Sequence, residues 1–176
     1  EALFDRLVPE NIFEDFVFNI KVGDTYDIDE LCKKLVFMGY EHSDVVEGQG
    51  QFARRGGIVD IYSAVNENPI RLDFFDEDVD AIKTLDAKTQ RSLGNISEAK
   101  IYPMRELVYN EEQVEIAIKN IEKDLNSFKN KTDKIKMLTD EVIEKLREQK
   151  SFSGVDRYIQ YFYDKTASLI DYFPKD

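Results

Sequence analysis

Two adjacent arginines beside a glycine pair are the residues of this chain best suited to bind another molecule. Arg54 and Arg55 directly precede Gly56-Gly57 in the stretch 50–62, which continues into a β-branched run. Each guanidinium is a planar fork of N–H donors that matches a carboxylate or a phosphate group. The glycine pair lacks Cβ atoms where a strand must kink, bulge or let another backbone approach. We therefore expect a binding site here, for carboxylates of a protein partner or for phosphate.

The two arginines need not act together. Successive strand residues face opposite sides of a sheet, so Arg54 and Arg55 are separated unless the glycine kink rotates one of them. One arginine could pair internally with an acidic residue such as Asp60 or Asp73, which leaves the other free for a partner. Because exposed ion pairs add little stability, recognition explains a surface arginine better than stability does.

Other polar residues predict weaker chemistry. The acidic cluster within residues 73–80 could hold a divalent cation for a metal-dependent hydrolase, but it lacks the turn glycine and closing glutamate of a calcium loop, which favours a solvated hairpin tip. His42 is the only histidine and has no cysteine nearby, so a surface position or a partner contact is favoured over zinc ligation. Cys32 lies in a helical pattern, which predicts an inert, buried thiol.

Catalytic and nucleotide-binding motifs are missing from the sequence. It contains neither a Gly-x-x-x-x-Gly-Lys-Ser/Thr loop nor a Gly-x-Ser-x-Gly elbow, and Gly48-x-Gly50 is followed by a strand pattern rather than a helix. We therefore expect no catalysis and no cofactor in this chain.

Composition limits the class of partner. The formal charge of -12 opposes binding to nucleic acid, whose affinity normally comes from neutralised phosphates. An apolar fraction of 42%, with 12 Phe and 9 Tyr, is enough for a folded core. A single cysteine excludes an internal disulfide and, with no signal-peptide pattern at the first residues, favours the cytoplasm. A first residue other than Met is typical of a piece of a longer protein.

The pattern along the chain predicts an α+β fold, with a small, mainly antiparallel mixed sheet and a packed helix. A strand over 16–21 precedes a helix over 28–38, capped by Asp27 with Glu30 in a capping box and ended by Gly39. A short strand over 43–47 is also possible. An antiparallel meander then follows, with expected strands at 52–62, 69–76, 79–86 and 98–102.

The character of the sequence changes near residue 105. Asn110 can cap a helix with apolar residues at helical spacing, and a second helix should carry Ile135, Leu138, Val142 and Leu146. We expect further helix at 154–163 and a terminal strand at 168–173. Residues 1–105 and 106–176 are therefore predicted to form separate domains, the second mostly helical.

Several strings of this sequence resemble the UvrB homology module, which is shared by UvrB and the bacterial transcription-repair coupling factor. They are Gly39-Tyr40, the stretch 50–62, the segment 69–83, Thr89-Gln90-Arg91-Ser92, Ile101-Tyr102-Pro103 and Asp171-Tyr172-Phe173-Pro174. Thr89-Gln90-Arg91-Ser92 and the aromatic segment 158–163 are more similar to the coupling factor than to UvrB. Ser63 and Met104 depart from the family pattern.

The resemblance implies a docking domain for the repair ATPase UvrA, centred on the arginine-rich strand. The residues that we expect at this partner surface are Arg54, Arg55, Phe52, His42 and Tyr62, although His42 lies near a position where relatives have an arginine. The resemblance also implies a longer protein in which a C-terminal domain masks this surface until stalled RNA polymerase is engaged. ATP, Mg²⁺, DNA and RNA polymerase would be bound by other domains of that protein, and residues 106–176 would be part of the flanking UvrB-like domain. The alternative is the corresponding UvrA-binding region of UvrB itself.

Overall fold

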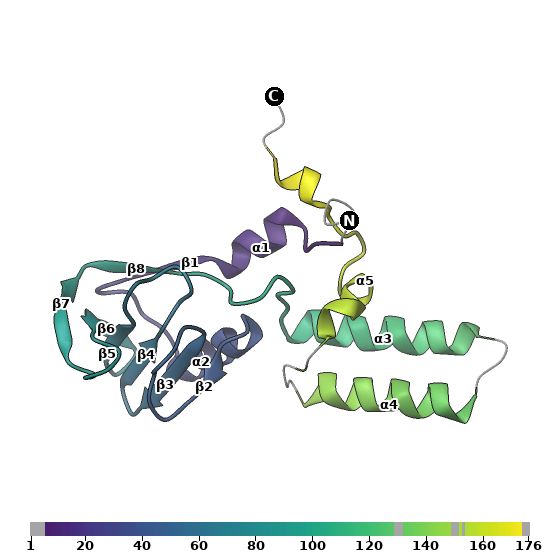
Figure 1. Ribbon diagram of the computed structural model, residues 1–176, viewed down its shortest axis with the longest axis horizontal. Coiled ribbons are helices and arrows are strands. Elements are labelled where there is room, and N and C mark those ends of the chain that lie inside the picture. Colours follow the sequence, from purple (N-terminus) through teal and green to yellow (C-terminus); the bar gives the residue numbers. More distant parts are fainter. Residues whose placement is uncertain (1–5, 129–131, 149–151, 153, 174–176) are drawn as a thin grey trace. The chain divides into compact units, whose positions relative to one another are not determined.

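The computed structural model describes residues 6–128, 132–148, 152 and 154–173, and these form two compact units (Figure 1). One unit comprises residues 14–105, and the other combines the described residues before 14 with those after 105. Helix α1 (Glu10–Phe16) crosses the division between them. From the sequence we had assigned all residues up to 105 to one domain, so the grouping of residues 6–13 with the second unit differs from that expectation.

A six-stranded sheet forms most of the unit of residues 14–105. Its strands lie in the order β2-β3-β4-β5-β6-β7, and all neighbours pair antiparallel except β2 and β3, which pair parallel. The predicted α+β class with a mainly antiparallel mixed sheet is confirmed. The bounds of the strands are β2 (Glu41–His42), β3 (Gln51–Arg55), β4 (Ile58–Ile61), β5 (Ile70–Phe75), β6 (Asp78–Leu85) and β7 (Ser92–Ile96).

A second, two-stranded sheet joins β1 (Phe18–Lys21) to β8 (Glu98–Ile101) in antiparallel register. The sequence had predicted both strands, but it had placed the second of them in the meander. Strand β7 was not predicted, because its residues are almost all exposed and lack the alternation that marks a half-buried strand.

The single strand expected over 52–62 is wrong, because the glycine pair forms a hairpin turn between β3 and β4. Gly56 has φ +60°, in the left-handed region that favours glycine. A Cβ built on Gly57 would lie 2.9 Å from the Phe74 carbonyl oxygen, so the next strand leaves no room for a side chain there. Both glycines are therefore required by the turn, one by its backbone angle and the other by its neighbour.

Helix α2 (Ile28–Phe37) begins where the sequence predicted. The Asp27 side chain accepts hydrogen bonds from the N–H groups of Asp29 (2.8 Å) and Glu30 (3.1 Å), and Gly39 follows the helix with φ +92°. The Glu30 side chain accepts a hydrogen bond from the Lys33 ammonium at 2.7 Å. The short strand expected over 43–47 is wrong, because this segment is a loop.

The core of this unit consists of apolar side chains from α2 and from one side of the sheet. Along β5 their burial follows the alternation that the sequence indicated, with Ile70 and Leu72 buried and Arg71 and Asp73 only partly so. The fully or almost fully buried members are Leu31, Leu35, Phe52, Val59, Ile61, Ile70, Leu72, Val79 and Ile82. The opposite side of the sheet is consequently available for polar residues.

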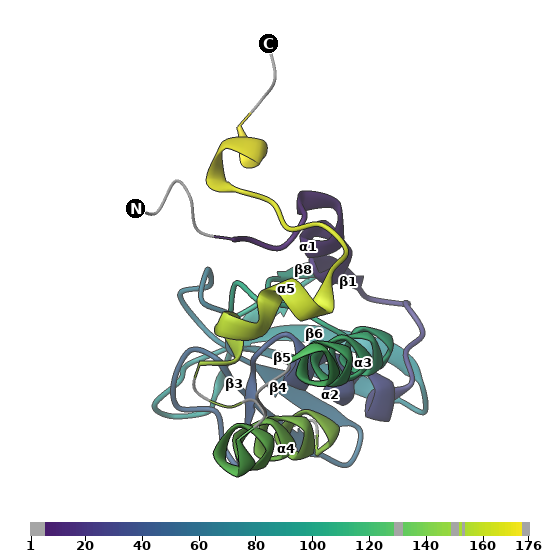
Figure 2. The same ribbon diagram turned by 90° about the vertical axis from the view of Figure 1, so that its right-hand side faces the viewer.

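The second unit is mostly helical, as predicted. Its main elements are α3 (Glu111–Ser127) and α4 (Asp133–Arg147), which lie side by side with α5 (Ile159–Phe162) against α3 (Figure 2). Asn110 forms the predicted N-cap with a reciprocal bond to Gln113. A 3-10 turn, η2 (Val155–Tyr158), precedes α5.

The terminal strand expected over 168–173 is wrong. Residues Leu169–Tyr172 form a 3-10 helix, η3, because the Asp171 carboxylate accepts hydrogen bonds from both the backbone N–H (2.8 Å) and the hydroxyl (2.9 Å) of Ser168. A local side-chain cap of this kind competes with an extended conformation. The nearby backbone pairing is a single bridge between Leu7 and Ala167.

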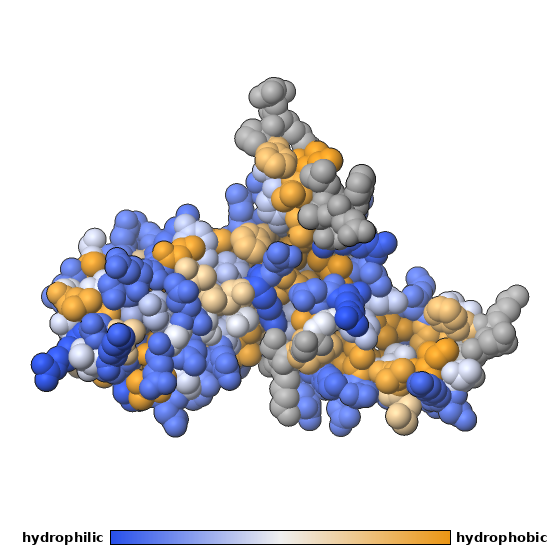
Figure 3. Space-filling view, viewed as in Figure 1, coloured by the Kyte–Doolittle hydropathy of each residue, from blue (hydrophilic) through white to orange (hydrophobic). Residues whose placement is uncertain are grey.

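An open apolar groove of about 210 Å³ lies between α3 and α4. Ile121 and Leu125 of α3 line it together with Ile135 and Leu138 of α4, and the apolar surface over these helices is visible in Figure 3. Of the apolar residues that the sequence assigned to α4, Ile135 and Leu138 are more than 40% exposed, whereas Leu146 is buried.

Candidate functional site

The candidate site is built on the side of the sheet that faces away from the core. Ala53 of β3, Asp60 of β4, Arg71 of β5 and Lys83 of β6 are direct neighbours across the sheet. Their side chains therefore share one side of it, and so does Arg55, which lies two residues from Ala53. We call the set Arg55, Asp60, Arg71, Asp73 and Lys83 the charged face.

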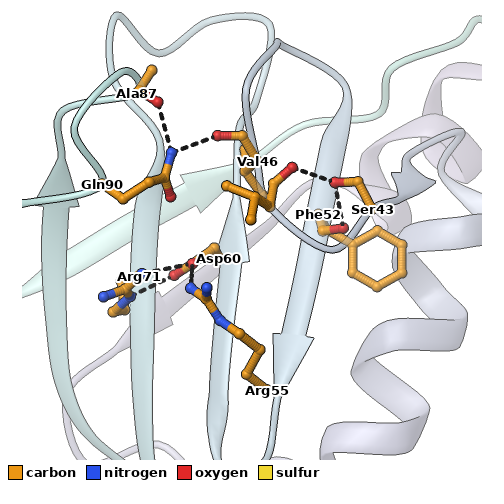
Figure 4. Close-up of polar contacts among 9 residues, drawn as sticks. Ser43, Val46, Phe52, Arg55, Asp60, Arg71, Ala87 and Gln90 are labelled. Carbon is orange, nitrogen blue, oxygen red and sulfur yellow. Dashed lines mark hydrogen bonds and ion pairs between the residues drawn. The ribbon is translucent and has the colours of Figure 1, made fainter.

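Asp60 connects two arginines of the charged face. Its Oδ1 accepts a hydrogen bond from Arg71 Nε (2.7 Å), and its Oδ2 accepts from Arg71 Nη2 (2.8 Å) and Arg55 Nη2 (2.6 Å). Figure 4 shows both arginine side chains converging on this carboxylate. The Asp60 side chain is 1% exposed, whereas Arg71 is 20% and Arg55 is 46% exposed. The hydrogen bonds from Arg71 to Asp60 also raise the pKa of Arg71 above its ordinary value.

A second ion pair lies beside the first on the same side of the sheet. Lys83 Nζ donates to Asp73 Oδ2 at 2.5 Å. With this pair included, the charged face has three cationic and two anionic side chains, within a chain whose formal charge is -12. Within this set the cationic side chains outnumber the anionic ones by one.

Arg54 points to the other side of the sheet. Its guanidinium donates a hydrogen bond to Asp29 of α2, which raises the pKa of Arg54 above its ordinary value. The expectation that one arginine pairs internally with Asp60 is confirmed for Arg55. The expectation that the second arginine is then free is wrong, because Arg54 has its own partner. The glycine pair therefore does not bring the two arginines to one surface.

An exposed aromatic residue lies at the end of the charged face. Phe75, the last residue of β5, is 79% exposed and lies two residues beyond Asp73, after a register shift between Asp73 and Phe74. The neighbouring hairpin turn is held by a hydrogen bond from the Phe74 N–H to the Gly57 carbonyl at 2.7 Å. Exposed aromatic residues and arginines are both side chains typical of protein-binding hot spots.

The other three predicted contact residues lie in different surroundings. Phe52 was predicted at the partner surface, but it is 2% exposed and belongs to the core. Its side chain is therefore not accessible to a partner. His42 is exposed on β2, and its ring packs edge-on against Phe52 with the ring centres 5.1 Å apart. Tyr62 is half-buried, and its hydroxyl donates to the Glu67 carbonyl at 2.8 Å.

Sequence reasoning missed Arg71 and Phe75 as candidate contacts. The signal for Arg71 was present, since it alternates with Ile70 and Leu72 and therefore had to lie on the polar side of its strand. What was lacking was the register that places Arg71 opposite Asp60, and the hairpin turn that brings Arg55 of β3 to the same carboxylate. Phe75 had no such signal, because a pair of adjacent phenylalanines is more typical of a core.

The arrangement provides hydrogen-bond donors and acceptors that are held in ion pairs. Asp73, which could have been a metal ligand, is paired with Lys83, and the described residues contain no group of three His, Cys, Asp or Glu side chains placed to hold a metal ion. In the same described ranges, no helix is both long and apolar enough to cross a membrane.

The fold and this site define the unit of residues 14–105 as a small α+β domain whose sheet has a core side and a charged side. Residues 18–107 match the family model described as the UvrB interaction domain. The chain belongs to this family.

The similar curated proteins are transcription-repair-coupling factors. That of Bacillus subtilis is 37% identical over 98% of this chain, that of Staphylococcus haemolyticus is 34% identical over 97%, and that of Staphylococcus aureus strain MRSA252 is 32% identical over 97%. The chain spans about 15% of the length of each of these relatives. Its homology to coupling factors therefore extends over nearly the whole chain, including the helical unit.

Proposed function

We propose that residues 14–105 bind UvrA through the charged face and Phe75. Membership of the UvrB interaction domain family and homology to transcription-repair-coupling factors support this partner. The single observation that carries the choice of surface is the exposed Arg55 guanidinium, which is held by a buried Asp60 carboxylate.

The electrostatics favour a protein partner over nucleic acid. A formal charge of -12 repels phosphate backbones at long range, whereas three cationic groups on one face can meet a patch of carboxylates at close range. Phe75 adds an apolar group that a pocket on the partner can bury.

In the longer protein, this docking would connect stalled RNA polymerase to nucleotide excision repair. The contacts with RNA polymerase and DNA, the ATP-driven movement along DNA and the C-terminal domain that masks the docking surface would belong to other parts of that protein. The chain described here would supply UvrA recruitment and no catalysis. The corresponding region of UvrB is the second candidate, favoured by the same family match.

The test compares the two adjacent arginines in a binding measurement with purified UvrA. Arg55→Glu puts a negative charge on the charged face and should weaken binding at least about tenfold, as expected for a hot-spot residue. Arg54→Glu alters the opposite side of the sheet and serves as the matched control, with a change of at most about threefold, typical of a rim or surface charge. Circular dichroism establishes that both variants are folded.

Equal binding by wild type and Arg55→Glu would refute the proposed surface. An Arg54→Glu variant that loses binding while Arg55→Glu retains it would move the docking site to the α2 side of the sheet. Replacing UvrA by a DNA duplex in the same assay should give no measurable binding at physiological salt.

A further inference from the structure

We infer that Asp60 is a positioning residue for docking: it fixes the Arg55 guanidinium in the orientation that meets a carboxylate of the partner. The inference rests on the proposed function, and it assigns a role to a buried residue that a partner cannot touch. Three observations carry it, namely the burial of Asp60, the geometry of its hydrogen bonds and the exposure of Arg55.

The hydrogen bonds form an ordered chain from the sheet to the surface. Arg71 donates to both oxygens of Asp60, and a two-bond contact between a guanidinium and a carboxylate fixes the plane of the acid. The Asp60 Oδ2 atom then accepts from Arg55 Nη2 at 2.6 Å. The orientation of Arg55 is thus determined by the strands β4 and β5 rather than by its own flexible side chain.

Arg55 keeps most of its binding capacity in this arrangement. A guanidinium has five N–H donors, and the contact with Asp60 uses one nitrogen, Nη2. Arg71 uses two nitrogens and is only 20% exposed, so it serves mainly to hold Asp60, whereas the 46% exposed Arg55 presents donors to solvent. Among the arginines bonded to Asp60, Arg55 should therefore dominate the contact with the partner.

Stability alone does not account for a carboxylate at this position. Replacing a buried ion pair by apolar residues of similar size is often neutral or stabilising, because removing charges from water is unfavourable. Position 60 has the buried Ala53 as its neighbour on β3, so an apolar residue would suit this part of the sheet. Orientation of Arg55 accounts for the buried charge, because a flexible arginine loses conformational entropy when a partner immobilises it and so binds less tightly.

The partner group that fits is a carboxylate. Two guanidiniums share a single acid, so a positive charge remains uncompensated next to the Asp73–Lys83 pair. An aspartate or glutamate of the partner can accept two parallel hydrogen bonds from the remaining edge of Arg55.

The test is a double-mutant cycle in UvrA affinity with the full chain. Asp60→Asn keeps the shape of the side chain but loses its charge. In the wild-type background it should weaken binding by about tenfold, within the range of coupling between contacting residues. In an Arg55→Ala background it should have no further effect, because the residue through which it acts is gone. Asp124→Asn, which alters a carboxylate that accepts a tyrosine hydroxyl in the helical unit, is the matched control and should leave affinity unchanged.

The possible outcomes separate the inference from the proposed function. If Asp60→Asn weakens binding equally in both backgrounds, Asp60 acts only on the fold and the positioning role is overturned. If Arg55→Ala alone leaves binding unchanged, the docking surface itself is wrong. If Asp60→Asn weakens binding in the wild-type background but not in the Arg55→Ala background, the inference is supported.

A second measurement does not depend on UvrA or on whether Asp60→Asn folds. Nitrogen NMR of the unchanged chain should show slow rotation of the Arg55 guanidinium, as expected for a group held by a buried acid, whereas Arg91, which lies in an exposed part of the chain, should rotate freely. Rotation of Arg55 as fast as that of Arg91 would overturn the positioning role.

Discussion

At the scale of single residues, Arg54 and Arg55 differ in their surroundings although they are adjacent in sequence. Arg55 lies on the charged face with Asp60, and Arg54 lies on the α2 side with Asp29. The contact of Arg54 is with an exposed carboxylate, and such pairs contribute little to stability. The positive charge of Arg54 also lies near the half-buried thiol of Cys32.

Burial is the main cause that raises the pKa of Cys32, while the positive charge of Arg54 lowers it and Asp29 raises it. We therefore expect Arg54→Ala to raise this pKa further and Asp29→Asn to lower it. The rate of reaction of the chain with a thiol reagent, measured as a function of pH, gives the pKa directly, because only the thiolate reacts. The pH at half-maximal rate should rise in Arg54→Ala. A fall there would mean that Arg54 does not lie beside Cys32 in solution.

At the scale of elements, features with a local cause were predictable from the sequence. The caps of α2 and α3 were identified in advance because Asp27 and Asn110 act on backbone groups within three residues. The apolar alternation of β5 likewise assigned Ile70 and Leu72 to the core. Such signals do not depend on where the rest of the chain lies.

Features that depend on distant pairing could not be predicted. The two-stranded sheet joins Phe18 to Ile101, which no local pattern indicates. For the candidate site, the arginine–glycine stretch indicated β3 and Arg55, and the structure includes Arg55 in the charged face. The contribution of Arg71 required the register that places it opposite Asp60.

The turn between β3 and β4 gives a prediction at this scale. Gly57→Ala puts a Cβ 2.9 Å from the Phe74 carbonyl oxygen. The end of β5 that carries Phe74 and Phe75 must therefore shift. Gly56→Ala meets no neighbour but keeps a left-handed backbone angle, which is unfavourable by about 1 kcal/mol for a residue with a side chain. We expect both variants to lower the midpoint of urea unfolding, and only Gly57→Ala to weaken UvrA binding as well.

The two variants serve as controls for each other, because both stiffen the same turn. Loss of UvrA binding in Gly56→Ala, with Gly57→Ala unaffected, would contradict the assignment of the turn and β5 to the docking surface.

At the scale of the whole molecule, the division into two units nearly coincides with the extent of the family match. The first unit covers residues 14–105 and the UvrB interaction domain model covers 18–107. This unit has 18 acidic and 11 basic residues in the sequence, whereas the charged face has three cationic and two anionic side chains. Such a distribution keeps other acidic molecules away except where carboxylates can meet the charged face.

Residues 14–105 produced alone should therefore fold and bind UvrA about as tightly as the full chain. The physical reasons are that the described unit has its own buried core from α2 and the sheet, and that all members of the charged face, with Phe75, lie within it. Binding of this piece to UvrA within about threefold of the full chain corresponds to a difference below about 1 kcal/mol. A folded piece with much weaker binding would mean that the helical unit contributes contacts. The Arg55→Glu substitution made in the isolated piece distinguishes the two cases. If the charged face is the whole docking surface, the substitution should reduce affinity by the same factor in the piece as in the full chain. A different factor would mean that the helical unit also contributes contacts.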